Sequence, residues 1–300
     1  MGLFDRLVAG FLPVVPKPLV RMVSARYIAG DKLDRAVEVV KKLNLSGALS
    51  TLDVLGEHVD RLDDAKATAG AYRRALEEID AKKLDCNVSV KLTALGLKLD
   101  KEFCLETTEA LVREAARLKN FVRIDMEDSS CTTDTLDLYR KLRARGHDNV
   151  GVVLQAYLRR TAEDVESLLD LSPNVRLCKG IYVEARRIAF QDGAIVNRSF
   201  VTLLDRLVDG GAYVGVATHD ERLVFEAERI VRKRKLLRSR YEFQMLLGVE
   251  RGLRDIVMAS GHRMRIYVPF GAAWYEYSVR RLKENPAIAG HVVRSLFARR

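Results

Sequence analysis

The chain has 300 residues, of which 48% are hydrophobic and 31% are charged, and its formal net charge is +10. This length fits one large domain, and no apolar run approaches the roughly 20 residues that a membrane-spanning helix needs. The positive charge is compatible with nucleic acid, a membrane surface, or an anionic substrate and cofactor as the partner.

Residues 1–45 are predicted to form an N-terminal helical segment, with one or two helices around Pro16–Leu43. The first residues lack the apolar core and small-residue cleavage site of a signal peptide, which favours a cytoplasmic protein. Phe4, Leu7, Val8 and Phe11 lie on one side of a predicted helix. This side either packs against the rest of the protein, which we favour, or touches the inner face of a membrane as a peripheral contact.

From residue 46 to residue 300, short β-branched runs alternate with longer amphipathic segments, which is typical of repeated βα units. Segments of helical length run between the strands, among them Lys101–Leu118, Ala162–Leu171, Arg187–Val208 and Glu221–Leu237. Eight units of this kind predict an α/β protein with a (β/α)8 barrel. The eight predicted strands are Ala48–Val54, Asn87–Leu92, Phe121–Glu127, Val150–Ala156, Val175–Tyr182, Tyr213–His219, Tyr241–Leu246 and Met264–Val268.

The cysteines and the basic residues exclude some other classes of site. Cys86, Cys104, Cys131 and Cys178 are scattered without a CxxC pair, so we predict no metal site and expect unpaired thiols in a reducing cytoplasm. The densest basic run, Arg232–Arg240, would point around much of a helix circumference, as in a solvated turn. No nucleic-acid-binding motif accompanies it, so we predict no nucleic acid partner.

Polar side chains recur near the carboxyl ends of the predicted strands. In a barrel these ends meet at the mouth where catalytic residues lie. Within FVRIDME, Arg123, Asp125 and Glu127 lie on one face and the apolar residues lie on the other. The strand-end residues that we expect at the mouth are Lys91, Asp125, Gln155, Arg176, Lys179, Thr218, His219, Gln244 and Tyr267.

The sequence contains neither GxGxxG nor GxxxxGK[ST], so a Rossmann or P-loop nucleotide site has no support. A nicotinamide or flavin cofactor would therefore have to lie on the barrel mouth, where Arg176, Lys179, His219 and Gly180 could receive its phosphates and ring. An alternative is a barrel aldolase that uses Lys91 or Lys179 as a Schiff-base amine.

A cluster of arginines and aromatic residues lies near the end of the chain, in RIYVPFGAAWYEYSVRRLKENP. Tyr277, Arg280, Arg281 and Glu284 fall at helical spacings, so they share one flank of a predicted helix that ends before Pro286. Two guanidinium groups that converge on one point suit a small carboxylate, which they bind through paired hydrogen bonds.

This C-terminal stretch resembles the proline dehydrogenase family, whose members are flavoenzymes that oxidise L-proline. The blocks TLDVLGE, SVKLTALG, RIDMED, VVLQAYLRR, VRLCKGIY, ATHD and YEFQMLLG follow in the family's order, so the resemblance covers most of the chain beyond Leu45. It implies that FAD lies on the barrel mouth beneath a final helix that carries Arg280 and Arg281.

The resemblance also implies roles for single residues. Asp125 and Arg176 would form the catalytic pair, with Arg176 close to the reactive flavin nitrogen. The substrate contacts would be Lys91, Leu246, Tyr267, Tyr277, Arg280 and Arg281, of which the two arginines bind the proline carboxylate. The FAD contacts would be Met126, Gln155, Arg176, Lys179, Gly180, Ile181, Thr218 and His219, although Ile181 stands where a smaller residue is expected.

The chemistry that the resemblance implies is hydride transfer from L-proline to the flavin, which yields Δ1-pyrroline-5-carboxylate. Electrons would then pass to a membrane quinone. The chain is too short to hold a second, aldehyde-oxidising domain, so a separate pyrroline-5-carboxylate dehydrogenase would act downstream.

Overall fold

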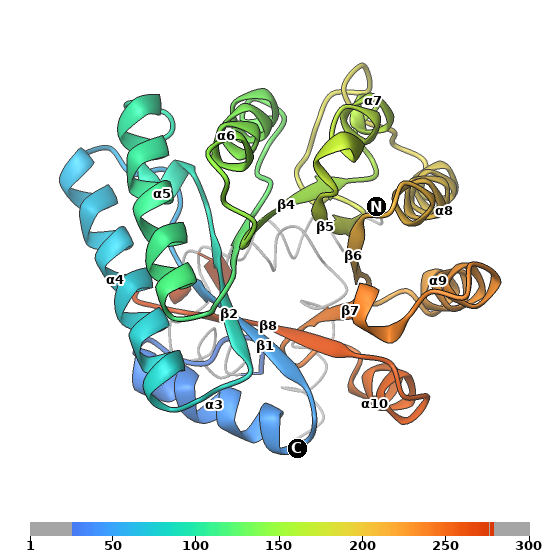
Figure 1. Ribbon diagram of the computed structural model, residues 1–300, viewed down its shortest axis with the longest axis horizontal. Helices are drawn as coiled ribbons and strands as arrows, with labels where there is room; N and C mark the ends of the chain where they lie inside the picture. Colours follow the sequence, from blue (N-terminus) through green and yellow to red (C-terminus); the bar gives the residue numbers. More distant parts are fainter. Residues whose placement is uncertain (1–25, 276, 279–300) are drawn as a thin grey trace, which may run out of the picture.

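The computed structural model describes residues 26–275, 277 and 278, which form a closed barrel of eight parallel strands (Figure 1). Each strand pairs with the next one along the chain, and β1 pairs with β8 to close the barrel. The predicted (β/α)8 barrel is therefore confirmed, and each predicted strand overlaps an observed one. The strands are β1 (Leu49–Val54), β2 (Cys86–Val90), β3 (Val122–Ile124), β4 (Val150–Gln155), β5 (Asn174–Cys178), β6 (Tyr213–Ala217), β7 (Tyr241–Leu246) and β8 (Met264–Phe270).

Helices connect the strands and surround the barrel (Figure 1). Three of them begin after an aspartate whose side chain accepts backbone N–H groups of the first turn: Asp100, Asp192 and Asp220. Such caps satisfy donors that have no partner inside the helix. The helices are α3 (Leu33–Leu45), α4 (Leu62–Ala81), α5 (Lys101–Arg117), α6 (Thr132–Ala144), α7 (Thr161–Glu166), α8 (Gly193–Asp209), α9 (Glu221–Lys233) and α10 (Arg251–Ala259), with short 3₁₀ turns η2 (Thr93–Leu95), η3 (Leu169–Leu171) and η4 (Arg238–Arg240).

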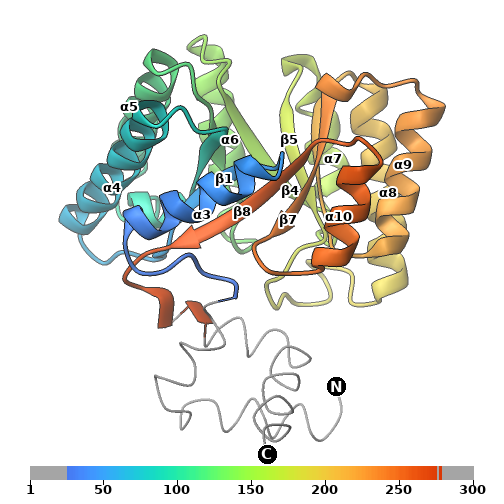
Figure 2. The same cartoon turned by 90° about the horizontal axis from the view of Figure 1, so that it is seen from below.

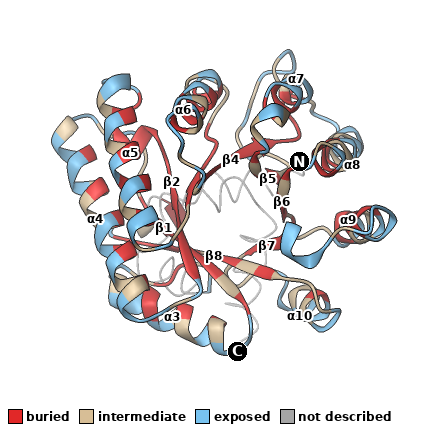
Figure 3. Cartoon of the chain, in the orientation of Figure 1, coloured by how far each residue is buried: buried red, intermediate tan, exposed pale blue. Residues whose placement is uncertain are grey.

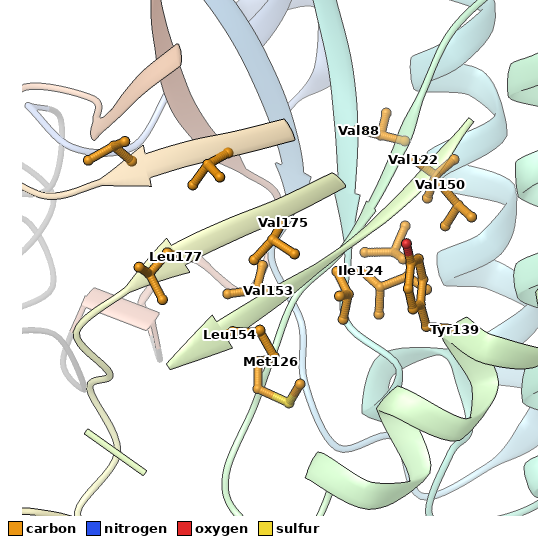
Figure 4. Packing of buried hydrophobic residues seen from close by; sticks show 14 of the residues in the cluster. Val88, Val122, Ile124, Met126, Tyr139, Val150, Val153, Leu154, Val175 and Leu177 are labelled. Atoms are coloured by element: carbon orange, nitrogen blue, oxygen red, sulfur yellow. The ribbon is translucent and has the colours of Figure 1, made fainter. Parts of the chain in front are cut away.

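The apolar core lies between the strands and the surrounding helices. Val122, Ile124 and Val150 point outward from β3 and β4 and pack in one cluster with Tyr139 of α6 (Figure 4). The helix faces turned toward the barrel are buried and the opposite faces are exposed (Figure 3). Since apolar side chains fill this outer layer, the alternation along each strand leaves polar residues for the barrel interior.

Helix α3 precedes the barrel in the sequence and packs against the outside of β1 and β8 (Figure 2). Just before it, Ile28 packs with Leu55 and Tyr277. The rest of the predicted N-terminal segment, up to residue 25, lies outside the described residues, as does most of the predicted final helix. The division into residues 1–45 and 46–300 stays a prediction.

Some helix boundaries differ from the predictions. Helix α8 begins at Gly193 instead of Arg187, because the residues before Gly193 fold back toward Tyr157. Phe190 N donates to Tyr157 O at 2.8 Å. Helix α9 ends at Lys233, and Lys235 has a left-handed φ of 49° that is incompatible with a continuing helix.

The basic run Arg232–Arg240 is partly neutralised within the protein. Nε of Arg234 donates to Oδ1 of Asp205 at 3.1 Å, and Nη1 of Arg234 donates to Oδ1 of Asp209. The absence of a nucleic acid partner stays a prediction. In the described part of the chain, no helix is long and apolar enough to cross a membrane.

Candidate active site

A cavity of about 620 Å³ lies where the carboxyl ends of the strands meet. Its size falls in the range of small-molecule and cofactor sites. Every predicted site residue that the structure describes lines it: Lys91, Asp125, Met126, Gln155, Arg176, Lys179, Gly180, Ile181, Thr218, His219, Leu246, Tyr267 and Tyr277. The barrel thus brings these residues together, while the role of each stays a proposal.

Asp125 is the centre of a buried hydrogen-bond network. Nη1 of Arg176 and Oγ of Ser89 each donate to its Oδ1 at 2.6 Å, and the hydroxyl of Tyr267 donates to its Oδ2 at 2.7 Å. Burial alone would raise the pKa of Asp125, but Arg176 and then Lys91 outweigh it and hold this pKa below its ordinary value. The group therefore stays an ionised carboxylate.

Lys91 is bound between two carboxylates. Its Nζ donates to Oδ1 of Asp53 at 2.6 Å and lies 3.8 Å from Oδ2 of Asp125. Burial would lower the pKa of Lys91, but Asp53 and Asp125 raise it above its ordinary value. A Schiff base needs a neutral amine, so this environment opposes the aldolase alternative for Lys91.

Tyr267 contacts both cations of this network. Its hydroxyl accepts a hydrogen bond from Nζ of Lys91 at 3.3 Å, and Cζ of Arg176 lies 5.2 Å from the centre of its ring. Burial, followed by the negative charges of Asp125 and Asp53, raises the pKa of Tyr267 well above its ordinary value. The phenol therefore stays protonated and acts as a donor.

Lys179 and His219 lie on the side of the cavity near α9. Nζ of Lys179 donates to Oδ2 of Asp220 at 2.6 Å, and Oδ1 of Asp220 also caps α9 by accepting from Arg222 N at 3.0 Å. Nε2 of His219 accepts from Leu246 N at 2.8 Å, which leaves the proton of the neutral ring on Nδ1. The carboxylate of Asp220 thus holds both Lys179 and the first turn of α9.

Position 180 requires a glycine because of its backbone conformation and because Tyr157 lies against it. Its φ is +106°, and an added Cβ would lie 2.1 Å from Cδ1 of Tyr157. Ile181, the next residue, is 42% exposed and lines the cavity. A larger side chain is thus accommodated at position 181 but not at position 180.

Two buried polar atoms of the cavity have no hydrogen-bond partner among the described residues. They are Oε1 of Gln155, an acceptor, and Nη2 of Arg176, a donor. Unpaired buried polar atoms are costly unless a ligand or water completes them. The cavity is therefore built for a ligand that carries both donors and acceptors.

A sequence model of the family described as "Proline dehydrogenase" matches residues 36–294 of the chain. The chain belongs to the proline dehydrogenase family.

Known members of the proline dehydrogenase family resemble nearly the whole chain. "Proline dehydrogenase 1" of Bacillus subtilis subsp. natto is 37% identical over 276 residues, which are 92% of this chain and 91% of the relative. "Proline dehydrogenase" of Deinococcus radiodurans is 34% identical over 275 residues, which are 90% of this chain and 89% of the relative. The resemblance to this family is therefore confirmed.

The barrel also recurs in longer bifunctional proteins. The crystal structure of proline utilization A (PutA) from Bdellovibrio bacteriovorus, inactivated by N-propargylglycine, superposes with a TM-score of 0.81 at 26% identity. The match covers 87% of this chain but only 32% of the PutA chain. The chain thus corresponds to one part of the PutA chain.

Sequence reasoning missed two residues of this site. Asp53, fully buried on β1, binds Lys91, and Ser89, fully buried on β2, binds Asp125. The signal for Asp53 was an ionisable residue inside the apolar run TLDVL, because a buried charge needs a partner. Ser89 had no such signal, since a serine in a strand is unremarkable.

Arg280 and Arg281, the predicted carboxylate clamp, and Glu284 lie outside the described residues. Their assignment to the substrate carboxylate rests on the sequence alone.

Proposed function

We propose that this protein oxidises L-proline to Δ1-pyrroline-5-carboxylate with FAD as its cofactor. The observation that carries the proposal is the Asp125–Arg176 pair in the cavity at the barrel mouth of a family member, where Nη2 of Arg176 and Oε1 of Gln155 have no partner among the described residues. The relatives named proline dehydrogenase supply the substrate.

The residues of the cavity fit a flavin. A flavin ring carries carbonyl acceptors and an N–H donor, which complement Nη2 of Arg176 and Oε1 of Gln155. Lys179 lines the cavity, and its ammonium would bind a phosphate group of the cofactor in competition with the carboxylate of Asp220. Met126, Gly180, Ile181, Thr218 and His219 complete the proposed contacts with FAD.

When bound, FAD would supply the acceptor for a hydride from the ring carbon beside the nitrogen of proline. The chain's own residues hold the charges around that transfer. Arg176 is fixed by Asp125, and its Nη2, which has no partner among the described residues, would supply a donor and a positive charge that stabilise negative charge on the cofactor. These charges stay fixed because Asp125 remains ionised and Tyr267 remains protonated.

Substrate selection would come from other residues of the same cavity. Lys91, Leu246, Tyr267 and Tyr277 line it and suit a small ring with one apolar face. Arg280 and Arg281 would bind the carboxylate of proline, which two guanidinium forks grip better than an ammonium does.

The electrons and the product must leave the protein. We propose a membrane quinone as the acceptor of the electrons and a separate pyrroline-5-carboxylate dehydrogenase as the enzyme that consumes the product. The support for both is the family resemblance.

The visible spectrum of the purified protein tests the proposal directly. We expect flavin absorption bands that bleach when L-proline is added without oxygen. Arg176→Ala should lower the flavin occupancy or the rate of bleaching. A protein that binds no FAD, or a flavin that L-proline does not reduce, would overturn the proposal.

A further inference from the structure

A second hydrogen-bond chain runs from Arg176 away from the cavity into the closed part of the barrel. Nε of Arg176 donates to Oε1 of Gln244, and Nε2 of Gln244 donates to Oε1 of Glu242 at 2.6 Å. Nε and Nη2 of Arg265 donate to the two oxygens of Glu242 at 2.6 and 3.1 Å. Thus Arg176 is bound on one side by Asp125 and on the other by a chain of three residues.

Glu242 is separate from the cavity. It is 1% exposed, and it is not among the residues that line the cavity at the strand ends. Burial would raise its pKa, but Arg265, Gln244 and Tyr213 outweigh burial and lower it. Glu242 is therefore a carboxylate that can only accept hydrogen bonds.

An acceptor at this place fixes which way the amide of Gln244 points. Gln244 must turn its NH2 group toward Glu242, so its oxygen faces Nε of Arg176. The reverse orientation would place the oxygen against the carboxylate and the NH2 group against the guanidinium. Both contacts would then be repulsive, so the charge of Glu242 determines how Arg176 is held.

The neighbouring strand leaves room for this amide. Gly215 of β6 pairs in register with Arg176 of β5 and Glu242 of β7. A Cβ at position 215 would lie 2.4 Å from Nε2 of Gln244. The absence of a side chain at this interior position is therefore what lets Gln244 lie between its two partners.

We infer that Glu242 is a positioning residue for the flavin reaction: through Gln244 it holds the guanidinium of Arg176, whose Nη2 would be left to bind the cofactor. This inference rests on the proposed function and adds to it a residue that does not itself line the cavity. Nε and Nη1 of Arg176 are both occupied by the protein, which leaves Nη2 as its buried donor without a partner in the described part of the chain.

The primary test is Glu242→Gln, which removes the charge but keeps the shape. We expect the FAD dissociation constant of the deflavinated protein to rise, and the rate of flavin reduction by L-proline to fall, by about ten- to a hundred-fold each. The KM for L-proline should change by less than about three-fold, because the carboxylate contacts are untouched. Glu109→Gln is the matched control, since it also removes a buried carboxylate with cationic partners, but on α5, outside the barrel interior.

A second variant displaces the side-chain amide of Gln244 without removing a charge. Gly215→Ala should displace Gln244 and reproduce the loss in FAD affinity and reduction rate. The control is Gly252→Ala in α10, where an added Cβ meets no atom within 4 Å. This pair keeps the inference testable if Glu242→Gln fails to fold.

A double-mutant cycle separates positioning from general damage. If Glu242 acts through Arg176, Glu242→Gln should have little further effect on flavin reduction in an Arg176→Lys background. An equal effect in both backgrounds, or losses in Glu242→Gln no larger than those in Glu109→Gln, would overturn the inference. If the wild-type protein binds no FAD or is not reduced by L-proline, the proposed function fails before any variant is compared.

Discussion

Arg176 and Asp125 form a 2.6 Å ion pair although their side chains are only 7% and 11% exposed. Removing two charges from water costs more than their attraction returns unless further hydrogen bonds complete both groups. Ser89 and Tyr267 complete Asp125, whereas Arg176 keeps one donor without a partner among the described residues. We therefore interpret the pair as holding the charge of Arg176 in place for a ligand, and not as a net source of stability.

Asp125→Asn tests how strongly this pair is coupled to the fold. The substitution leaves Arg176 and Lys91 with one buried negative charge fewer, so we expect the free energy of unfolding to fall by about 3–5 kcal/mol. Flavin reduction by L-proline should also slow by at least about ten-fold. Urea unfolding and anaerobic bleaching measure the two effects.

The control for this variant is Asp164→Asn, which breaks the pair between Asp164 and the half-exposed Arg160. We expect a smaller loss of stability there and unchanged flavin reduction. Wild-type stability in Asp125→Asn would contradict the view of Asp125 as the centre of a buried charge network.

Tyr267→Phe removes one hydroxyl that bonds both Asp125 and Lys91. We expect a loss of about 1–3 kcal/mol in stability, because a carboxylate oxygen loses its donor in a buried site. The rate of flavin reduction should fall as well. Tyr241→Phe also removes a hydroxyl, the one bonded to Nδ1 of His262 at 2.8 Å, and it should leave flavin reduction unchanged. Equal kinetics in the two variants would rule out a role of the Tyr267 hydroxyl at the site.

The fold could be predicted because each strand carries a local signal. β-branched runs such as Val150–Ala156 are long and apolar, and their number and spacing select a barrel. The ends of helices were harder to predict from the sequence. Helix α8 begins only after the chain has folded back on Tyr157, and this contact is tertiary.

The site could be predicted as far as single polar residues reveal themselves at strand ends. Asp125, Arg176 and Lys91 were found in this way, together with the family resemblance. Asp53 was missed because its role depends on reaching Lys91 on the next strand. The orientation of Gln244 is set by Glu242 and Gly215, and pairing of this kind between strands has no signature in one sequence.

The stability of the fold at low pH should depend partly on Glu109, which lies outside the barrel interior. Hydrogen bonds from His147, and also from Arg145 and Arg113, outweigh burial and lower the pKa of Glu109 from 4.5 to about 2. A carboxyl with a lower pKa in the folded state stabilises the fold above its unfolded pKa and loses that contribution as the pH falls toward its folded pKa. Wild type should therefore exceed Glu109→Gln in stability above a pH of about 4.5, and the difference should vanish by a pH of about 2. Thermal unfolding across this range checks it, and a difference independent of pH would contradict it.

The last prediction concerns Arg281, whose proposed role rests on the sequence and on the family. A hydrogen bond between charged groups is worth roughly 1.5–3 kcal/mol, and leaving the carboxylate without its partner adds to the loss. Arg281→Met should therefore raise the KM for L-proline by roughly ten- to a few hundred-fold, while FAD stays bound. Arg281→Lys should recover only part of the loss, because an ammonium cannot reproduce the planar fork.

Pyrrolidine, which is proline without its carboxylate, separates substrate binding from damage to the fold. Wild type should oxidise pyrrolidine poorly, since the arginines then have nothing to bind. Arg281→Met should oxidise it about as well as wild type does, because the substituted group makes no contact with this substrate. If the substitution slows pyrrolidine and proline equally, Arg281 acts on the fold or on the flavin, and the carboxylate clamp is wrong.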